Sequence, residues 1–138
     1  MILFATLLVA AAAQPPAWIQ RATIPPPIVA WRLADVLGTP IVEGIAIDRD
    51  DVSHIVMVNV VDSRFDPPRI VKQRDLPGSK VRWLRAGTRD GLYRDEIAVD
   101  VVDHGKETAY LLRVRRGFQL ELARKMRGTS LSPRTFSH

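Results

Sequence analysis

Two apolar, β-branched runs that flank a short charged turn constrain the fold of this chain more than any other feature. The first run, Ile41–Asp48, alternates so that every second residue falls on one face of an extended strand. Arg49–Asp51 follows as a charged turn, and Val52–Val61 supplies a second apolar run. Two such runs joined by so short a polar loop predict an antiparallel hairpin.

A second hairpin is predicted over residues 96–115. Ile97–Val102 is rich in valine, and Thr108–Val114 is again rich in residues that favour strands. Between them, Asp103–Lys106 has the composition of a hairpin turn.

The segment between the hairpins predicts shorter elements. Pro67-Pro68 indicates a corner, Arg69–Val71 a short strand, and residues 72–80 a loop that leads into a strand over Val81–Arg85. Alternation along this last strand assigns its residues to two faces: Val81, Trp83 and Arg85 on one, Arg82 and Leu84 on the other.

Helices are predicted near both ends of the domain. Gly117–Arg127 carries Phe118, Leu122 and Met126 at helical spacing, with Gly128 placed to end the helix. Ile28–Leu37 fits either a short helix or a buried strand. The expected fold class is therefore α+β: a small, mostly antiparallel sheet of four or five strands with one or two packed helices.

Length and composition limit the possible domain organisation of the chain. The chain has 138 residues, of which 46% are hydrophobic and 25% charged, as in ordinary globular domains. We expect an apolar N-terminal segment and proline-rich connector over 1–27, one α+β domain over 28–128, and a flexible polar tail over 129–138. The absence of cysteine excludes disulfides, thiolate metal sites and a cysteine nucleophile.

The first thirteen residues leave two interpretations open. Met1–Ala13 carries no charged side chain and ends in three alanines before Gln14, which is typical of a cleaved secretory signal. No Lys or Arg precedes Arg21, however, and these residues also have good propensity for a buried internal helix. The first interpretation predicts export after cleavage near Ala13, or contact with a membrane, and the second a cytoplasmic protein.

The charge balance favours an anionic partner. The formal net charge is +5 and the sequence pI near 10.2, with 16 arginines against 4 lysines. Arginine offers a planar fork for phosphate or carboxylate, although a GC-rich genome also raises the arginine content. The basic side chains concentrate between positions 64 and 94, near two aromatic residues, Trp83 and Tyr93. Their alternative role is a solvated surface, partly neutralised by six nearby acids.

Residues 55–97 resemble the second half of the AlbA-like DNA-binding domain of the Schlafen type, which is found in many bacterial proteins. The resemblance rests on the order of motifs: an apolar run ending in Asp62-Ser63-Arg64, the Pro67-Pro68 corner, a basic loop, the Val81–Arg85 run, Gly87-Thr88-Arg89 and Asp95-Glu96. The family's opening part, an acidic helix and an E-F-K-like strand, is absent. Residues 1–13 would then be the remnant of an internal helix.

The resemblance implies nucleic-acid contact. Arg82, Arg85 and Arg89 would contact phosphate, and Trp83 or Tyr93 would stack on bases. An alternative role for Arg85 is an ion pair with Glu96 that orders the turn after Gly87. Because the nuclease carboxylates of Schlafen-type enzymes lie in the absent part, no nuclease activity is implied.

No catalytic or metal site is predicted. Ser63 has no histidine nearby in sequence to act as its base, and His54, His104 and His138 lack ligand spacing. Adjacent carboxylates such as Asp50-Asp51 and Asp95-Glu96 point apart on a strand.

The sequence thus predicts a nucleic-acid-binding module without catalytic activity or cofactor. The alternatives are an exported small β-rich protein with no nucleic-acid role, and an interaction piece of a larger assembly. In that last case, exposed strand edges would pair with a second copy or another protein.

Overall fold

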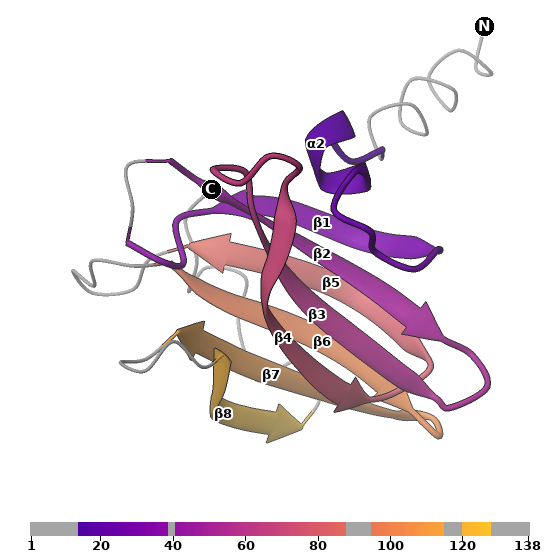
Figure 1. The fold of residues 1–138 in the computed structure, drawn as a ribbon. Coiled ribbons are helices and arrows are strands. Elements are labelled where there is room, and N and C mark those ends of the chain that lie inside the picture. Colours follow the sequence, from indigo (N-terminus) through magenta and orange to yellow (C-terminus); the bar gives the residue numbers. More distant parts are fainter. Residues whose placement is uncertain (1–13, 39–40, 88–94, 115–119, 128–138) are drawn as a thin grey trace, which may run out of the picture.

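The fold consists of two four-stranded antiparallel sheets (Figure 1). A computed structural model describes residues 14–38, 41–87, 95–114 and 120–127, and in the last range the backbone alone. In chain order these residues form α2 (Ala17–Gln20), β1 (Ile28–Ala34), β2 (Glu43–Asp50), β3 (Ile55–Asp62), β4 (Arg69–Pro77), β5 (Lys80–Gly87), β6 (Glu96–Asp103), β7 (Lys106–Val114) and β8 (Leu120–Arg127). Each sheet is a meander, with strand order β1-β2-β3-β4 in the first and β5-β6-β7-β8 in the second.

The hairpin predicted over residues 41–61 is confirmed as β2–β3. The register runs from Gly44 opposite Val61 to Asp50 opposite Ile55. The Asp50 carboxylate closes the loop because it accepts hydrogen bonds from the backbone N–H groups of Val52 and Ser53 and from the Ser53 hydroxyl. The Ser53 hydroxyl is the main reason that the pKa of Asp50 lies below its usual value.

The second predicted hairpin is confirmed as β6–β7. Asp103 pairs with Lys106, and the two residues between them, His104 and Gly105, have φ angles of 49° and 76°. Positive φ at both central positions is the geometry of the tight turn that matches the twist of an antiparallel pair.

The predicted α+β class is wrong. Within the described residues the only helix is the four-residue α2, and eight strands replace the four or five expected. In place of the helix predicted over Gly117–Arg127, β8 pairs with β7 over Leu120–Arg127, while Phe118 lies outside the described residues. The sequence Leu-Glu-Leu-Ala-Arg-Lys-Met-Arg also fits a period of two, and the open edge of β7 supplies the backbone partners that decide between the periods.

Two other segments extend as strands. Ile28–Ala34 forms β1, which settles the choice left open between helix and strand. The prediction of a loop over residues 72–80 is wrong, because β4 continues to Pro77 and pairs with β3. β4 is a sheet edge with mostly exposed or half-buried polar side chains, so its composition resembles that of a loop.

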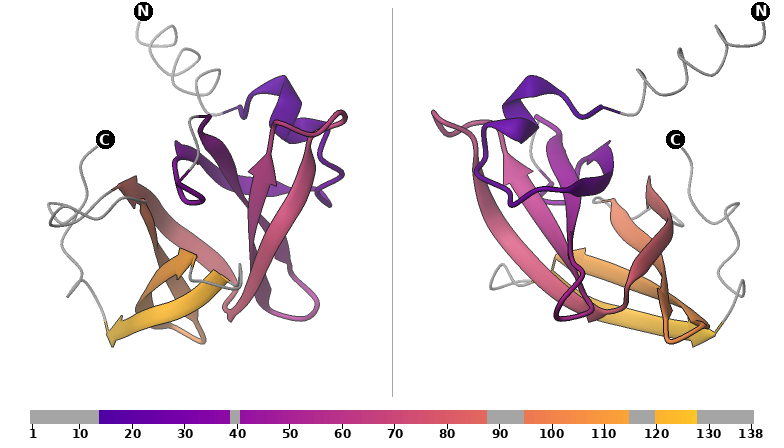
Figure 2. Two further views of the ribbon diagram at one scale, coloured as in Figure 1. Left: turned by 60° about the vertical axis from the view of Figure 1, so that its left-hand side comes forward. Right: turned by 90° about the vertical axis from the view of Figure 1, so that its right-hand side faces the viewer.

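The two sheets form two layers around a shared apolar core (Figure 2). The first sheet contributes the inward side chains of Ile45, Ile47, Val56, Val58 and Val60, and the second those of Leu84, Ile97, Val99, Tyr110 and Leu112. β1 lies beside β5. At one end of this seam, Asp35 N–H donates to Asp95 Oδ2 and Asp95 N–H donates to the Asp35 carbonyl, both at 2.8 Å.

The outer face of the first sheet is covered by the segment that precedes β1. Ile19 is fully buried there, with Ala22, Ile24 and Ala46, and Trp18 and Trp31 pack around them. A Cβ at Gly44 would lie 2.7 Å from Ile19 Cδ1, so a larger residue there would displace the Ile19 side chain. Residues 14–27 are thus a structural part of the sandwich.

Candidate functional site

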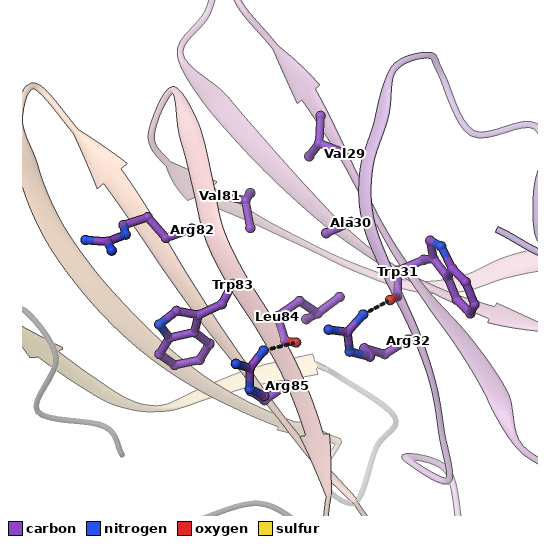
Figure 3. A pocket seen from close by; sticks show the side chains of 9 residues that line it. All are labelled: Val29, Ala30, Trp31, Arg32, Val81, Arg82, Trp83, Leu84 and Arg85. Carbon is purple, nitrogen blue, oxygen red and sulfur yellow. Dashed lines mark hydrogen bonds between the residues drawn. The ribbon is translucent and has the colours of Figure 1, made fainter. Parts of the chain in front are cut away.

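A groove of about 380 Å³ runs along the seam where β1 lies beside β5 (Figure 3). Both strands are sheet edges, so each carries backbone groups that its own sheet does not pair. Four consecutive residues of β1 and five of β5 line the groove: Val29, Ala30, Trp31, Arg32, Val81, Arg82, Trp83, Leu84 and Arg85. It therefore combines an apolar floor with three arginines.

A β-bulge in β5 decides where its side chains point. Val81 pairs with Val101, but the next register pair is Trp83 with Asp100, so Arg82 is the extra residue. As a result Val81 and Leu84 pack toward the core, while Trp83 packs on Ala98, Ala109 and Leu111 on the outer face of the second sheet. The prediction that Val81 shares a face with Trp83 and Arg85 is wrong for this reason.

Arg32 on β1 and Arg85 on β5 line the groove from its two sides. Figure 3 shows their guanidinium groups on either side of Leu84. Arg32 Nη1 donates to the Trp31 carbonyl at 2.8 Å, and Arg85 Nη1 donates to the Leu84 carbonyl at 3.3 Å. Partial burial and then the positive charge of Arg85 hold the pKa of Arg32 below its usual value. Two like charges are therefore brought together in a groove.

Trp83 lies next to Arg85 on the outer face of β5. The Arg85 guanidinium carbon is 5.6 Å from the centroid of the Trp83 ring, within the range of cation–π attraction. Trp83 is half-buried, and its ring points away from β1 (Figure 3). A ligand that crosses β5 from the seam thus meets Arg32, Arg85 and the indole in turn.

Arg82 is engaged elsewhere. Its side chain points away from β1 (Figure 3), and Nη1 lies 3.0 Å from Oε2 of Glu107. Its charge is thus partly neutralised, and it is a weaker candidate for phosphate contact than Arg32 and Arg85.

Glu107 also neighbours a buried acid, Asp100. Asp100 is 0% exposed, and no donor from the described residues reaches either of its carboxyl oxygens or Glu107 Oε1. Burial raises the pKa of Asp100 to about 7, and the hydrogen bond and charge of Glu107 add to the effect, whereas Arg82 opposes it. A proton held between the two carboxyls satisfies both groups, so this pair changes charge near neutral pH.

The predicted site residues divide into two groups. Arg82, Arg85 and Trp83 lie together on β5, whereas Arg89 and Tyr93 lie outside the described residues. In the first sheet, Arg64 binds Asp62 through a side-chain fork whose closest contact is 2.6 Å, and Arg69 lies 3.9 Å over the Phe65 ring. Among the described residues, the basic side chains of positions 64–85 are therefore distributed over both sheets.

Arg32 is the functional candidate that the sequence analysis missed. It lies about fifty residues before Arg85 and belongs to the other sheet. Alternation in Ile28–Ala34 hints at a strand, but no local signal indicates that β1 packs beside β5. The alternative role predicted for Arg85 is an ion pair with Glu96. On β6, however, the register partner of Arg85 is Ala98, and Glu96 is opposite Gly87.

The remaining candidate residues lie in turns and at hairpin tips. Asp62, at the end of β3, accepts from the N–H of Arg64 and closes the turn around Ser63, and the Arg64 side chain holds the pKa of Asp62 below its usual value. The rings of His54 and His104 lie 6.0 Å apart at two hairpin tips, a proximity that sequence spacing does not reveal. No cluster of three or more potential metal ligands occurs among the described residues.

No family model, curated protein or solved structure matches the chain. The resemblance to the Schlafen-type domain stays a prediction. Among the residues with described structure, no helix has the length and apolar character needed to cross a membrane.

Proposed function

We propose that the protein binds single-stranded nucleic acid through the β1–β5 groove and catalyses no reaction. The observation that carries the proposal is the position of Arg32 and Arg85 on opposite strands of one groove, with Trp83 beside Arg85. Guanidinium groups form bidentate, charge-assisted hydrogen bonds with phosphate oxygens, and aromatic rings stack on bases. A net charge of +5 attracts a polyanion from a distance.

A single strand suits this groove better than a duplex. Bases of a duplex are stacked inside the helix, whereas a single strand can turn one base onto an indole. A strand that crosses β5 would place a base on Trp83 and its phosphate at Arg85 and Arg32. The Arg89 and Tyr93 contacts predicted from the sequence stay predictions.

Fluorescence anisotropy with a labelled single-stranded oligonucleotide tests this proposal. Arg32→Gln and Arg85→Gln should each weaken binding by about tenfold, because each removes charge-assisted hydrogen bonds to phosphate. Arg21→Gln is the matched control: it removes the same charge from an exposed position on the covering segment of the first sheet.

The comparison with Arg21→Gln separates the groove from general charge. Equal weakening by all three variants would mean that binding follows net charge alone and would contradict a site at the seam. Absence of binding by the wild type to both DNA and RNA strands at low salt would refute the function itself.

Export is the second candidate. That alternative expects a small β-rich protein, and the described residues form two antiparallel sheets. It would separate the protein from nucleic acid, whereas the proposed function expects a cytoplasmic protein. The intact mass of the protein purified from its native host distinguishes them. A chain starting at Gln14 would support export, and one that retains Met1 would oppose cleavage.

A further inference from the structure

The two arginines at the seam carry more positive charge than one internal phosphate can neutralise. Arg32 and Arg85 line one groove from its two strands, and neither forms an ion pair with another described residue. Their bonds in the structure go to the neutral backbone carbonyls of Trp31 and Leu84. The pair therefore keeps both positive charges available to a ligand.

The charge of a phosphate depends on its place in a strand. An internal phosphodiester carries one negative charge, whereas a terminal phosphate monoester carries roughly −1.5 to −2 at pH 7, with a second pKa near 6. It also presents three terminal oxygens, enough for a bidentate contact from each guanidinium. Two adjacent arginines are thus best balanced by a monoester.

The size of the groove agrees with a strand end. Its volume of about 380 Å³ lies near the lower limit of small-ligand pockets, roughly 300–1,000 Å³. Its walls are the two edge strands, and Ala30, Val81 and Leu84 form an apolar floor. This volume accommodates about one nucleotide and not a segment of several nucleotides.

We infer that the groove binds the phosphorylated end of a nucleic-acid strand, with the terminal phosphate between Arg32 and Arg85 and the end base on Trp83. This inference rests on the proposed function and narrows its ligand. It assigns to Arg32 and Arg85 the discrimination between a phosphorylated and an unphosphorylated end.

The test compares oligonucleotides of one sequence that differ at their ends. Single strands with a 5′-phosphate, a 3′-phosphate or two hydroxyl ends are titrated against the full chain at the same ionic strength. We expect one phosphorylated strand to bind about tenfold more tightly than the hydroxyl strand, because the monoester adds charge-assisted bonds. This preference should shrink below pH 6, as the monoester gains a proton.

Variants assign the preference to the pair. Arg32→Gln and Arg85→Gln should bind all three strands alike, whereas Arg21→Gln should keep the wild-type preference. If wild-type protein binds all three strands equally well, the inference fails and the proposed function stands; if it binds none, both fail.

A free nucleotide is the other source of the same phosphate chemistry. A nucleoside monophosphate should bind more weakly than the phosphorylated strand, because the strand adds contacts beyond its end. Equal affinity for the two would overturn the assignment to a strand end.

Discussion

The two sheets of this protein treat buried polar groups on their outer faces in different ways. On the first sheet, Asn59 is fully buried and its amide donates to Asp48 Oδ1 and to the Ala46 carbonyl, while Gln73 donates to its oxygen. On the second sheet, Asp100 is equally buried beside Glu107 with no donor from the described residues. The first network is complete in one protonation state, whereas the second needs a shared proton. Of these two buried groups, only the pair on the second sheet is expected to change charge near neutral pH.

The largest expected effect comes from breaking the cover of the first sheet. Ile19→Ala removes a fully buried side chain that packs on Gly44 and should lower the free energy of unfolding by about 2–4 kcal/mol. Urea denaturation measures this loss. Val52→Ala, at a position 90% exposed, is the control and should change stability little. A small effect at Ile19 would contradict the view that residues 14–27 are part of the sandwich.

The next effect concerns the acid pair of the second sheet. Because the pKa of Asp100 is about 7 in the fold and near 3.8 in the unfolded chain, the folded state holds a proton that the unfolded state loses. Stability should therefore fall as the pH rises from about 4 to about 7, by at least about 1 kcal/mol. Asp62, whose pKa is lowered, acts at more acidic pH, where stability falls as the pH drops.

Asp100→Asn should remove this dependence, because the amide supplies a permanent donor to Glu107. We expect the variant to be more stable than the wild type at pH 8, with little difference near pH 4. Thermal unfolding across this range checks the expectation. A wild-type profile that stays level between pH 4 and pH 7 would refute the shared proton.

The smallest stability effect is expected at Arg82, whose exposed side chain forms an ion pair with Glu107 beside Asp100. Arg82→Gln removes an ion pair whose arginine side chain is 51% exposed, so it should change the free energy of unfolding by less than about 1 kcal/mol. Because Arg82 opposes the rise in the pKa of Asp100, its loss should move the pH transition upward. A transition that moves downward would contradict the arrangement of charges.

Local pattern made part of this fold predictable. The β2–β3 and β6–β7 hairpins follow from β-branched runs and turn residues close in sequence. The fate of Leu120–Arg127 depends on the distant edge of β7, and a helical period misled the prediction. Trp83 and Arg85 could be placed together because they share a strand, whereas Arg32 could not, because only packing of the two sheets brings it to the same groove. The bulge at Arg82, which turns Val81 inward, has no clear local signal.

An NMR titration of the indole N–H signals tests whether nucleic acid binds at the seam. Trp83 lies at the groove, whereas Trp18 belongs to the cover of the first sheet. Addition of a single-stranded oligonucleotide should move the Trp83 signal and leave that of Trp18 in place, and the shift should diminish in Arg85→Gln. A bound complex in which the Trp83 signal stays fixed would contradict the account.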